Sequence, residues 1–143
     1  LDIIATDHAP HTWDEKQKPY LEAPAGVPLV QHSLLLLLEA YKEGRVSLEK
    51  IVEKACHAPA VCFDVKDRGY LREGYFADAV LIDLNKTTTV NKENILYKCG
   101  WSPFEGHTFN ASIQKTFVNG NLLFDKGQQV DDIKGMRLEF DRV

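Results

Sequence analysis

The sequence lacks several features that mark common classes of protein. Its longest apolar run, at Leu34–Leu38, is far short of the roughly 20 residues that a helix needs to cross a bilayer. No signal peptide is visible at its start. Its 17 basic residues are scattered and are outnumbered by 21 acidic ones, for a net charge of -4. We therefore expect neither a membrane nor a nucleic acid among its partners.

Cysteine is also scarce. The three cysteines, Cys56, Cys62 and Cys99, are odd in number and lack the paired Cys-x-x-Cys spacing of a structural zinc site. We therefore expect reduced thiols in a cytoplasmic protein.

The stretch from Leu1 to His11 carries the most informative pattern. Residues 1–5 are mostly apolar without helical periodicity, which predicts a buried strand. The polar segment that follows offers one carboxylate and two imidazoles, from Asp7, His8 and His11. Chemistry in α/β enzymes lies at the carboxyl ends of such strands, so Asp7 is a candidate catalytic or metal-binding residue. The alternative is that Asp7 only caps or turns the chain and that the histidines are structural.

Length limits what this strand can belong to. The 143 residues suffice for one compact domain, but a (β/α)8 barrel takes about 250. Only one barrel-type strand is visible, at the extreme N-terminus, and no methionine starts the chain. We therefore expect a C-terminal portion of a larger polypeptide, inactive and poorly folded without the remainder.

Two helices and a long loop are predicted next. Residues 13–25 are polar and contain prolines, which indicates a functional loop over the strand ends. Pro28 suits the first turn of a helix, because its missing N–H would have no partner there, and Gly44 ends that helix. Ser47 is a good N-cap for a second helix, which we expect to break and restart at Pro59.

The composition then shifts towards β-structure. Gly69 and Gly74 frame a turn before an apolar strand predicted at residues 77–84. Asp78 in this strand is expected to bond nearby backbone rather than to bind a ligand. His32 upstream is expected to be structural, and His107 downstream has no recognisable partner in the sequence.

The last part of the chain predicts a hairpin and a tail strand. Segments 113–118 and 121–124 flank Asn119-Gly120, a dipeptide that supplies the positive φ angles of a type I′ turn. Apolar and charged residues alternate over Met136–Phe140, which predicts a half-exposed strand.

Several motifs resemble those of dihydroorotases, the zinc amidohydrolases of pyrimidine biosynthesis, in the same order and at similar spacing. They are the Asp-His segment Thr6–Thr12, Pro24-Ala25-Gly26, the glycine-framed entry to the strand at 77–84, Ser102-Pro103-Phe104 and the Asn119-Gly120 hairpin. Hydantoinases and allantoinases look similar around the Asp-His pair but usually lack the second histidine, here His11.

The resemblance implies an α/β fold with two parts. Residues 1–68 are expected to form the C-terminal end of a (β/α)8 metal-dependent amidohydrolase barrel, with its last strand, an active-site loop and helices. Residues 69–143 are expected to form part of a small β-sandwich domain, with a returning loop and a hairpin. The implied activity is the reversible interconversion of L-dihydroorotate and N-carbamoyl-L-aspartate. The implied partners are a small-molecule substrate and the remainder of the same polypeptide, and a homo-oligomer is compatible with them.

The resemblance also implies roles for individual residues. Asp7 would be the catalytic residue and a ligand of one or two zinc ions, whose other ligands lie outside this sequence. His11 would bind the substrate carboxylate, while Ala25 and Gly26 would contact the substrate through their backbone. His8 is expected to pack beside the site. From the residues alone, His11 could instead stabilise its loop, and Gly26 could merely turn the chain.

Two other functions stay open at this stage. An allantoinase or a dihydropyrimidinase would share the metal site but recognise a different side of its substrate. A non-catalytic relative would keep the barrel as an assembly scaffold and lose metal ligands, which would show in residues upstream of Leu1.

Overall fold

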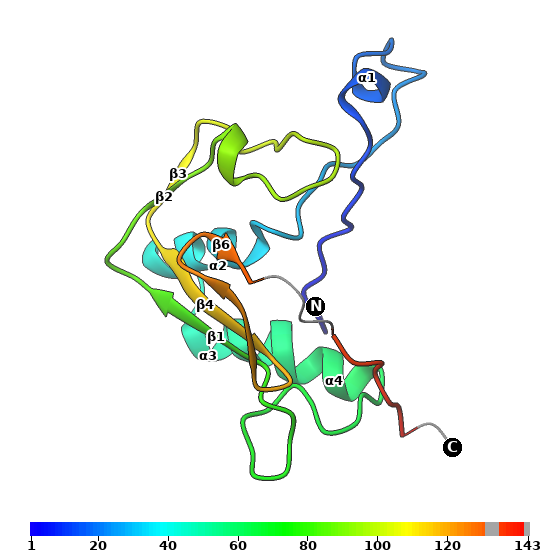
Figure 1. The fold of residues 1–143 in the computed structure, drawn as a ribbon. Helices are drawn as coiled ribbons and strands as arrows, with labels where there is room; N and C mark the ends of the chain where they lie inside the picture. The colour runs from blue at the N-terminus through cyan, green and yellow to red at the C-terminus, as the bar shows by residue number, and fades with distance from the viewer. Residues whose placement is uncertain (131–134, 142–143) are drawn as a thin grey trace.

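A computed structural model describes residues 1–130 and 135–141 and shows a layer of helices against a twisted antiparallel sheet (Figure 1). The helices are α1 (Trp13–Lys16), α2 (Ser33–Lys42), α3 (Leu48–Val52) and α4 (Ala58–Cys62), with a π-helical turn η1 (Glu53–His57) and a 3-10 turn η2 (Lys92–Asn94). The strands are β1 (Ala79–Asp83), β2 (Thr88–Thr89), β3 (Thr108–Phe109), β4 (Ser112–Val118), β5 (Asn121–Asp125) and β6 (Gln128–Gln129). Within the described residues, no helix is both long enough and apolar enough to cross a membrane.

The main sheet forms around the predicted hairpin. Its strand order is β1-β4-β5-β6, and all neighbours are antiparallel. Asn119 and Gly120 have φ angles of 54° and 79°, which confirms the turn predicted between β4 and β5. The strand predicted at 77–84 is confirmed as β1. β2 and β3 form a separate two-stranded sheet that the sequence did not indicate.

The first predicted helix starts later than expected. α2 begins at Ser33 rather than at Pro28, and Gly44, with φ 72°, follows its end as predicted. The delay has a tertiary cause, because the N–H of Gln31, which would open a helix at Pro28 by donating to the carbonyl of Val27, donates instead to the Tyr97 hydroxyl at 3.1 Å. The Val27 carbonyl accepts the N–H of Ala9, and residues 29–32 form a turn closed by the His32 N–H on the Leu29 carbonyl.

The second predicted helix does not break at Pro59. The Ser47 hydroxyl accepts the N–H of Lys50 at 3.2 Å, which confirms the predicted N-cap of α3. α3 then runs through η1 into α4, where Pro59 occupies the first turn. A π-helical turn widens the backbone and leaves room for a proline, which lacks an N–H and would clash in a regular helix.

Two predicted strands are absent from the described residues. Residues 1–12 are extended but form no strand, and the N–H of Ile4 donates to the carbonyl of Lys54 in η1. A strand requires a neighbouring strand to pair with, and none of the described residues supplies one. Met136–Phe140 also forms no strand; it is joined to the chain near α4 by an isolated bridge between Val65 and Phe140 and by the N–H of Lys66, which donates to the carbonyl of Glu139.

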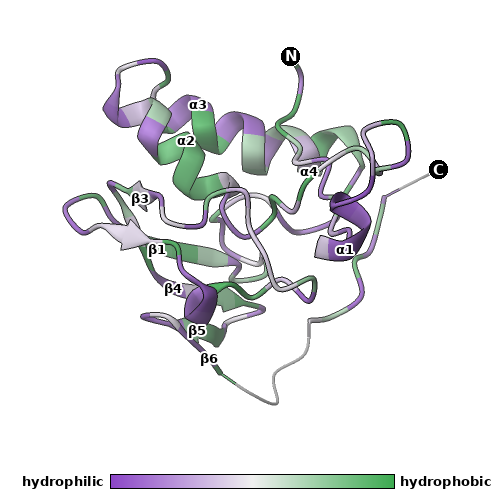
Figure 2. Ribbon diagram, turned by 90° about the horizontal axis from the view of Figure 1, so that it is seen from above, coloured by the Kyte–Doolittle hydropathy of each residue, from purple (hydrophilic) through white to green (hydrophobic). Residues whose placement is uncertain are grey.

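The core connects the helices to the sheets. Its buried members are Leu35 and Leu38 from α2, Val90, Phe109 and Ala111. Figure 2 shows that the leucine run of α2 is hydrophobic, whereas α1 is hydrophilic. In Figure 1, α2 lies against the sheet and α1 stands apart from it. This core therefore holds the helices and the sheets together. Among the described residues, α1 contributes no side chain to it.

Candidate active site

The Asp7 carboxylate is exposed and unpaired. None of the described residues donates a hydrogen bond to it or forms an ion pair with it. The backbone of Asp7 has φ 46°, in the left-handed region, where aspartate is one of the few tolerated residues besides glycine. Strain of this kind persists only where the surroundings impose it, and it is frequent at functional sites. The carboxylate is therefore available as an acceptor for a metal or a proton.

His8 is held by backbone N–H groups and an aromatic ring. Its Nδ1 accepts hydrogen bonds from Leu29 and Val30, so this nitrogen carries no proton. The imidazole also lies 5.3 Å from the ring of Tyr97. These contacts fix the chain on the C-terminal side of the Asp7 carboxylate.

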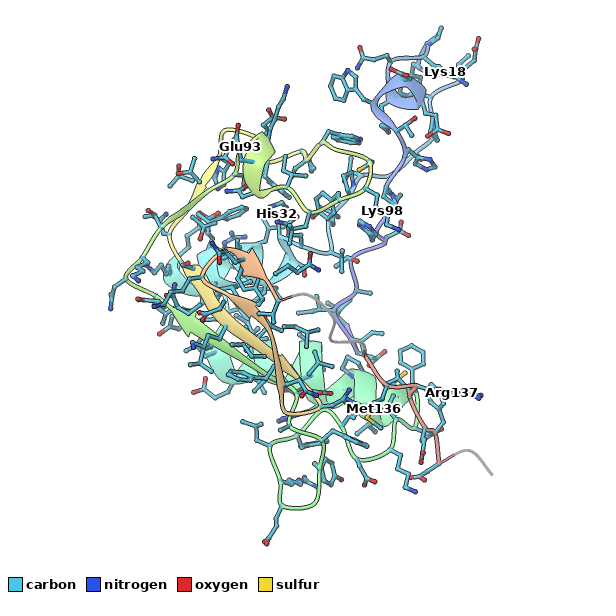
Figure 3. All side chains as sticks on the ribbon, viewed as in Figure 1. Lys18, His32, Glu93, Lys98, Met136 and Arg137 are labelled. Atoms are coloured by element: carbon cyan, nitrogen blue, oxygen red, sulfur yellow. The ribbon has the colours of Figure 1, made fainter. Side chains whose placement is uncertain are left out.

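His11 lies between a carboxylate and a tryptophan from the distant returning loop. Its Nδ1 is 3.9 Å from a carboxylate oxygen of Glu15. Its backbone carbonyl accepts the indole N–H of Trp101 at 2.8 Å, and Trp101 packs edge-on against Trp13. Figure 3 shows the returning loop, with Lys98 labelled, next to the N-terminal segment. The loop that carries Ser102-Pro103-Phe104 therefore returns to the Asp-His segment, as predicted.

A short helix fills part of the predicted loop at 13–25. Thr12 caps α1 through a capping box, in which its hydroxyl accepts the N–H of Glu15 and the Glu15 carboxylate accepts the N–H of Thr12. The Thr12 backbone N–H and the Thr12 hydroxyl, which also donates to the Glu15 carboxylate at 2.9 Å, hold the pKa of Glu15 below its ordinary value. Glu15 therefore remains ionised beside His11 over a wide pH range.

Gly26 brings the far end of this loop back against the Asp-His segment. Its φ is 85°, and a Cβ at this position would lie 2.5 Å from the Cβ of Ala9. The N–H of Ala9 also donates to the carbonyl of Val27 at 3.1 Å. Only glycine fits so close an approach, so Gly26 turns the chain here and brings the exposed residues Ala25 and Gly26 close to the segment that carries Asp7.

The described residues do not contain a complete metal site. No group of three or more histidine, cysteine, aspartate or glutamate side chains converges among residues 1–130 and 135–141. The donor that fits a metal is Asp7, since an unpaired carboxylate oxygen is a normal ligand for zinc. This chain can thus contribute one ligand.

A buried polar cluster lies behind the Asp-His segment. His32 is 2% exposed, and its Nδ1 lies 3.0 Å from the hydroxyl of Tyr97 and 3.4 Å from that of Ser102. The Tyr97 hydroxyl accepts the N–H of Gln31, which leaves its own hydrogen free for His32. Burial lowers the pKa of His32 and raises that of Tyr97. His32 is therefore structural, as predicted.

Two further side chains have structural partners. Asp78 forms an ion pair with buried Arg68 and accepts the N–H of Asn119 at 2.8 Å, which confirms its predicted backbone-bonding role. His107, for which the sequence indicated no partner, lies 3.2 Å from the Glu39 carboxylate.

Sequence reasoning missed the contacts that organise the loop. Lys16, Tyr97 and Trp101 all touch the Asp-His loop or its surroundings, and none was a candidate. For Trp101 the signal was its place in the Ser-Pro-Phe motif. For Lys16 the sequence offered no signal, since one lysine in a polar loop resembles any other.

The chain matches one family profile and several known sequences over most of its length. The profile described as the amidohydrolase family matches residues 2–123. A dihydroorotase of Halobacterium salinarum is 37% identical over 125 residues, covering 87% of this chain and 29% of that protein. A dihydroorotase of Pyrococcus abyssi is 33% identical over 138 residues, covering 96% of this chain and 33% of that protein. The chain thus spans about a third of the length of these relatives.

Comparison with solved structures gives the same fold. An L-hydantoinase (dihydropyrimidinase) from Arthrobacter aurescens superposes with a TM-score of 0.82 at 29% identity, covering 91% of this chain and 30% of that one. A D-hydantoinase (dihydropyrimidinase) from Thermus sp. superposes with a TM-score of 0.84 at 23% identity, covering 92% of this chain and 30% of that one.

Proposed function

Because this chain belongs to the amidohydrolase family, we propose that it is the C-terminal part of a dihydroorotase, which opens and closes the cyclic amide of L-dihydroorotate. The observation that carries the proposal is the exposed, unpaired carboxylate of Asp7, held with φ 46° in one loop with His11 and Gly26. The relatives named dihydroorotase support the choice of substrate.

We propose that residues 1–68 complete a (β/α)8 barrel and that residues 69–143 belong to a small β-sandwich domain. The extended segment 1–5 would become the last barrel strand when neighbouring strands are present. Its exposed Leu1, together with exposed Val52 and Val61 on the helices, supports this, because such apolar side chains are normally covered. The remainder of the same polypeptide is thus the proposed partner of this surface.

Asp7 is the residue of this chain that would hold the metal, which we propose to be one or two zinc ions. When bound, zinc supplies Lewis-acid polarisation of the amide carbonyl and activates water at neutral pH. We propose that the other ligands come from outside this chain, since no group of three or more histidine, cysteine, aspartate or glutamate side chains converges among the described residues.

The chemical role of Asp7 is to move one proton. As water attacks the amide carbon and the carbon–nitrogen bond breaks, the carboxylate accepts a proton from the water and returns it to the departing nitrogen. Ring closure uses the same transfer in reverse. Because Asp7 is exposed and none of the described residues donates to it, one oxygen can hold the metal while the other takes the proton.

His11 and the glycine turn would bind the substrate. An imidazole N–H can donate to the substrate carboxylate, and the His11 ring is partly exposed beside Glu15, 3.9 Å away. The exposed backbone of Ala25 and Gly26 offers hydrogen bonds close to the same segment. We propose that these three residues orient the cyclic amide of the substrate and that Asp7 transfers the proton.

The alternative is a hydantoinase-type amidase, which the likeness to the Arthrobacter aurescens L-hydantoinase favours. The test is turnover by the full-length protein that carries this chain, with dihydroorotate, allantoin and hydantoin at equal concentrations. We expect kcat/KM for dihydroorotate to exceed the other two by at least about a hundredfold, because His11 recognises a carboxylate that only dihydroorotate has. A preference for hydantoin or allantoin would overturn the proposal.

A further inference from the structure

The side chain of Lys16 binds the backbone at the far end of the candidate active-site loop. Its Nζ donates to the carbonyl of Pro24 at 2.6 Å and to the carbonyl of Gly26 at 3.0 Å. These two carbonyls flank Ala25, so one ammonium group holds both ends of the Pro24-Ala25-Gly26 turn. Bonds from a charged donor to a carbonyl are among the stronger hydrogen bonds in proteins.

The short helix α1, which carries Lys16, is itself fixed in place. The capping box of Thr12 and Glu15 sets the start of α1, and the Trp101 indole holds the carbonyl of His11 just before it. Lys16 lies in the last turn of α1, so its ammonium is anchored relative to His11. The turn at 24–26 is thereby tied to the same short helix that follows the proposed carboxylate-binding histidine.

We infer that Lys16 is a positioning residue, which holds the backbone at Ala25 and Gly26 in the geometry that binds the substrate. This inference rests on the proposed function, because it assigns a task to the backbone that the proposal places against the substrate. Lys16 acts through that backbone and is not itself a catalytic residue.

The geometry distinguishes Lys16 from the other lysine of the loop. Lys16 is half-buried and spends two of its three N–H donors on the turn. Lys18 is exposed, makes no hydrogen bond within the described residues and contributes only a favourable charge near Glu15 (Figure 3). The two residues have the same charge and lie in the same segment, so Lys18 is a matched control.

The experiment compares Lys16→Met, Lys16→Arg and Lys18→Met in the full-length protein. For Lys16→Met we expect KM for dihydroorotate to rise about tenfold or more with kcat within about twofold. The reason is that the backbone contacts of Ala25 and Gly26 with the substrate, which this change weakens, bind the ground state and the transition state alike. Lys16→Arg keeps a charged donor and should restore KM to within about threefold of the parent. Lys18→Met should leave both constants unchanged.

Hydrogen exchange supplies a readout that does not depend on activity. Amide exchange over residues 17–26 should accelerate in Lys16→Met and not in Lys18→Met, while exchange in α2 stays constant and shows an intact fold. Faster exchange without a change in KM would overturn the positioning role, as would unchanged exchange and KM.

The two proposals fail in different ways. A parent protein that turns over none of the cyclic amides would overturn the proposed function, and the role of Lys16 would fall with it. An active parent in which Lys16→Met behaves like Lys18→Met would overturn only the role of Lys16.

Discussion

Two carboxylates of this chain, Asp7 and Asp78, have opposite surroundings. Asp7 is exposed, has no partner among the described residues and is held at a positive φ. Asp78, by contrast, neutralises buried Arg68, whose guanidinium also donates to Asn119 at 2.6 Å and covers the ring of Phe76 at 4.1 Å. The first carboxylate is available for chemistry, and the second holds the entry of the chain into β1.

Replacing Asp78 tests the structural half of this division. In Asp78→Ala, Arg68 remains buried without its counter-ion and the N–H of Asn119 loses its acceptor. Because Asp78 is about one-third exposed, solvent compensates in part, and we expect the free energy of unfolding to fall by about 2–3 kcal/mol. Urea denaturation of the full-length protein measures this loss.

Asp83→Ala is the matched control for that measurement. Asp83 ends the same strand, and its carboxylate accepts the N–H of Asn85 at 2.9 Å without pairing with a buried cation. Its loss should reduce stability by at most about 1 kcal/mol. Equal losses in the two variants would contradict the special role given to Asp78.

Among the helices, strands and turns, the sequence predicted those that depend on interactions between neighbouring residues. Asn119-Gly120 sets the hairpin through its own backbone preferences, and Ser47 caps α3 through a bond to Lys50. Both involve residues at most three positions apart. β1 was predicted from its apolar composition. β4, the strand that pairs with it, was predicted as part of the hairpin.

The elements that the sequence did not predict depend on distant partners. α2 begins late because the N–H of Gln31 donates to the distant Tyr97 hydroxyl instead of opening a helix at Pro28. Residues 1–5 lack a neighbouring strand, and β2 finds its partner β3 only through the fold. No local pattern contains these pairings.

The candidate site shows the same division. Asp7, His11 and Gly26 could be selected from motif spacing, and the close approach of Gly26 to Ala9 explains why glycine is needed there. The contact of Trp101 with His11 joins residues far apart in the sequence. It becomes visible only when the returning loop folds against the Asp-His segment.

At the scale of the whole molecule, one core joins α2 to the β-strands. Leu35 and Leu38 pack with Val90, Phe109 and Ala111, so the helices and the sheets stabilise each other. His32 lies at the edge of this core, with its ring stacked against Phe109 at 6.0 Å. A titratable group so placed links the stability of the molecule to pH.

Burial lowers the pKa of His32 in the folded chain, so the unfolded chain binds a proton first as the pH falls. The free energy of unfolding should therefore decrease below about pH 6.5, the ordinary histidine value, and level off below the lowered pKa. Urea denaturation at a series of pH values measures this fall. His32→Asn, which keeps an acceptor near Nδ1 for Tyr97, should flatten it even if overall stability drops.

His107→Asn serves as the comparison. His107 is exposed and pairs with Glu39, so it does not share the burial that depresses the pKa of His32. Its removal should not flatten the fall in stability below about pH 6.5. If His107→Asn flattened the curve and His32→Asn did not, the assignment to His32 would be wrong.

The central claim is that the Asp7 carboxylate moves the proton during opening of the cyclic amide. Asn has almost the same size but cannot accept that proton. The most direct measurement is kcat of Asp7→Asn in the full-length protein with dihydroorotate, with circular dichroism as the check on folding. We predict a loss of at least about a thousandfold with the fold unchanged, whereas retention of most of the activity would contradict the account.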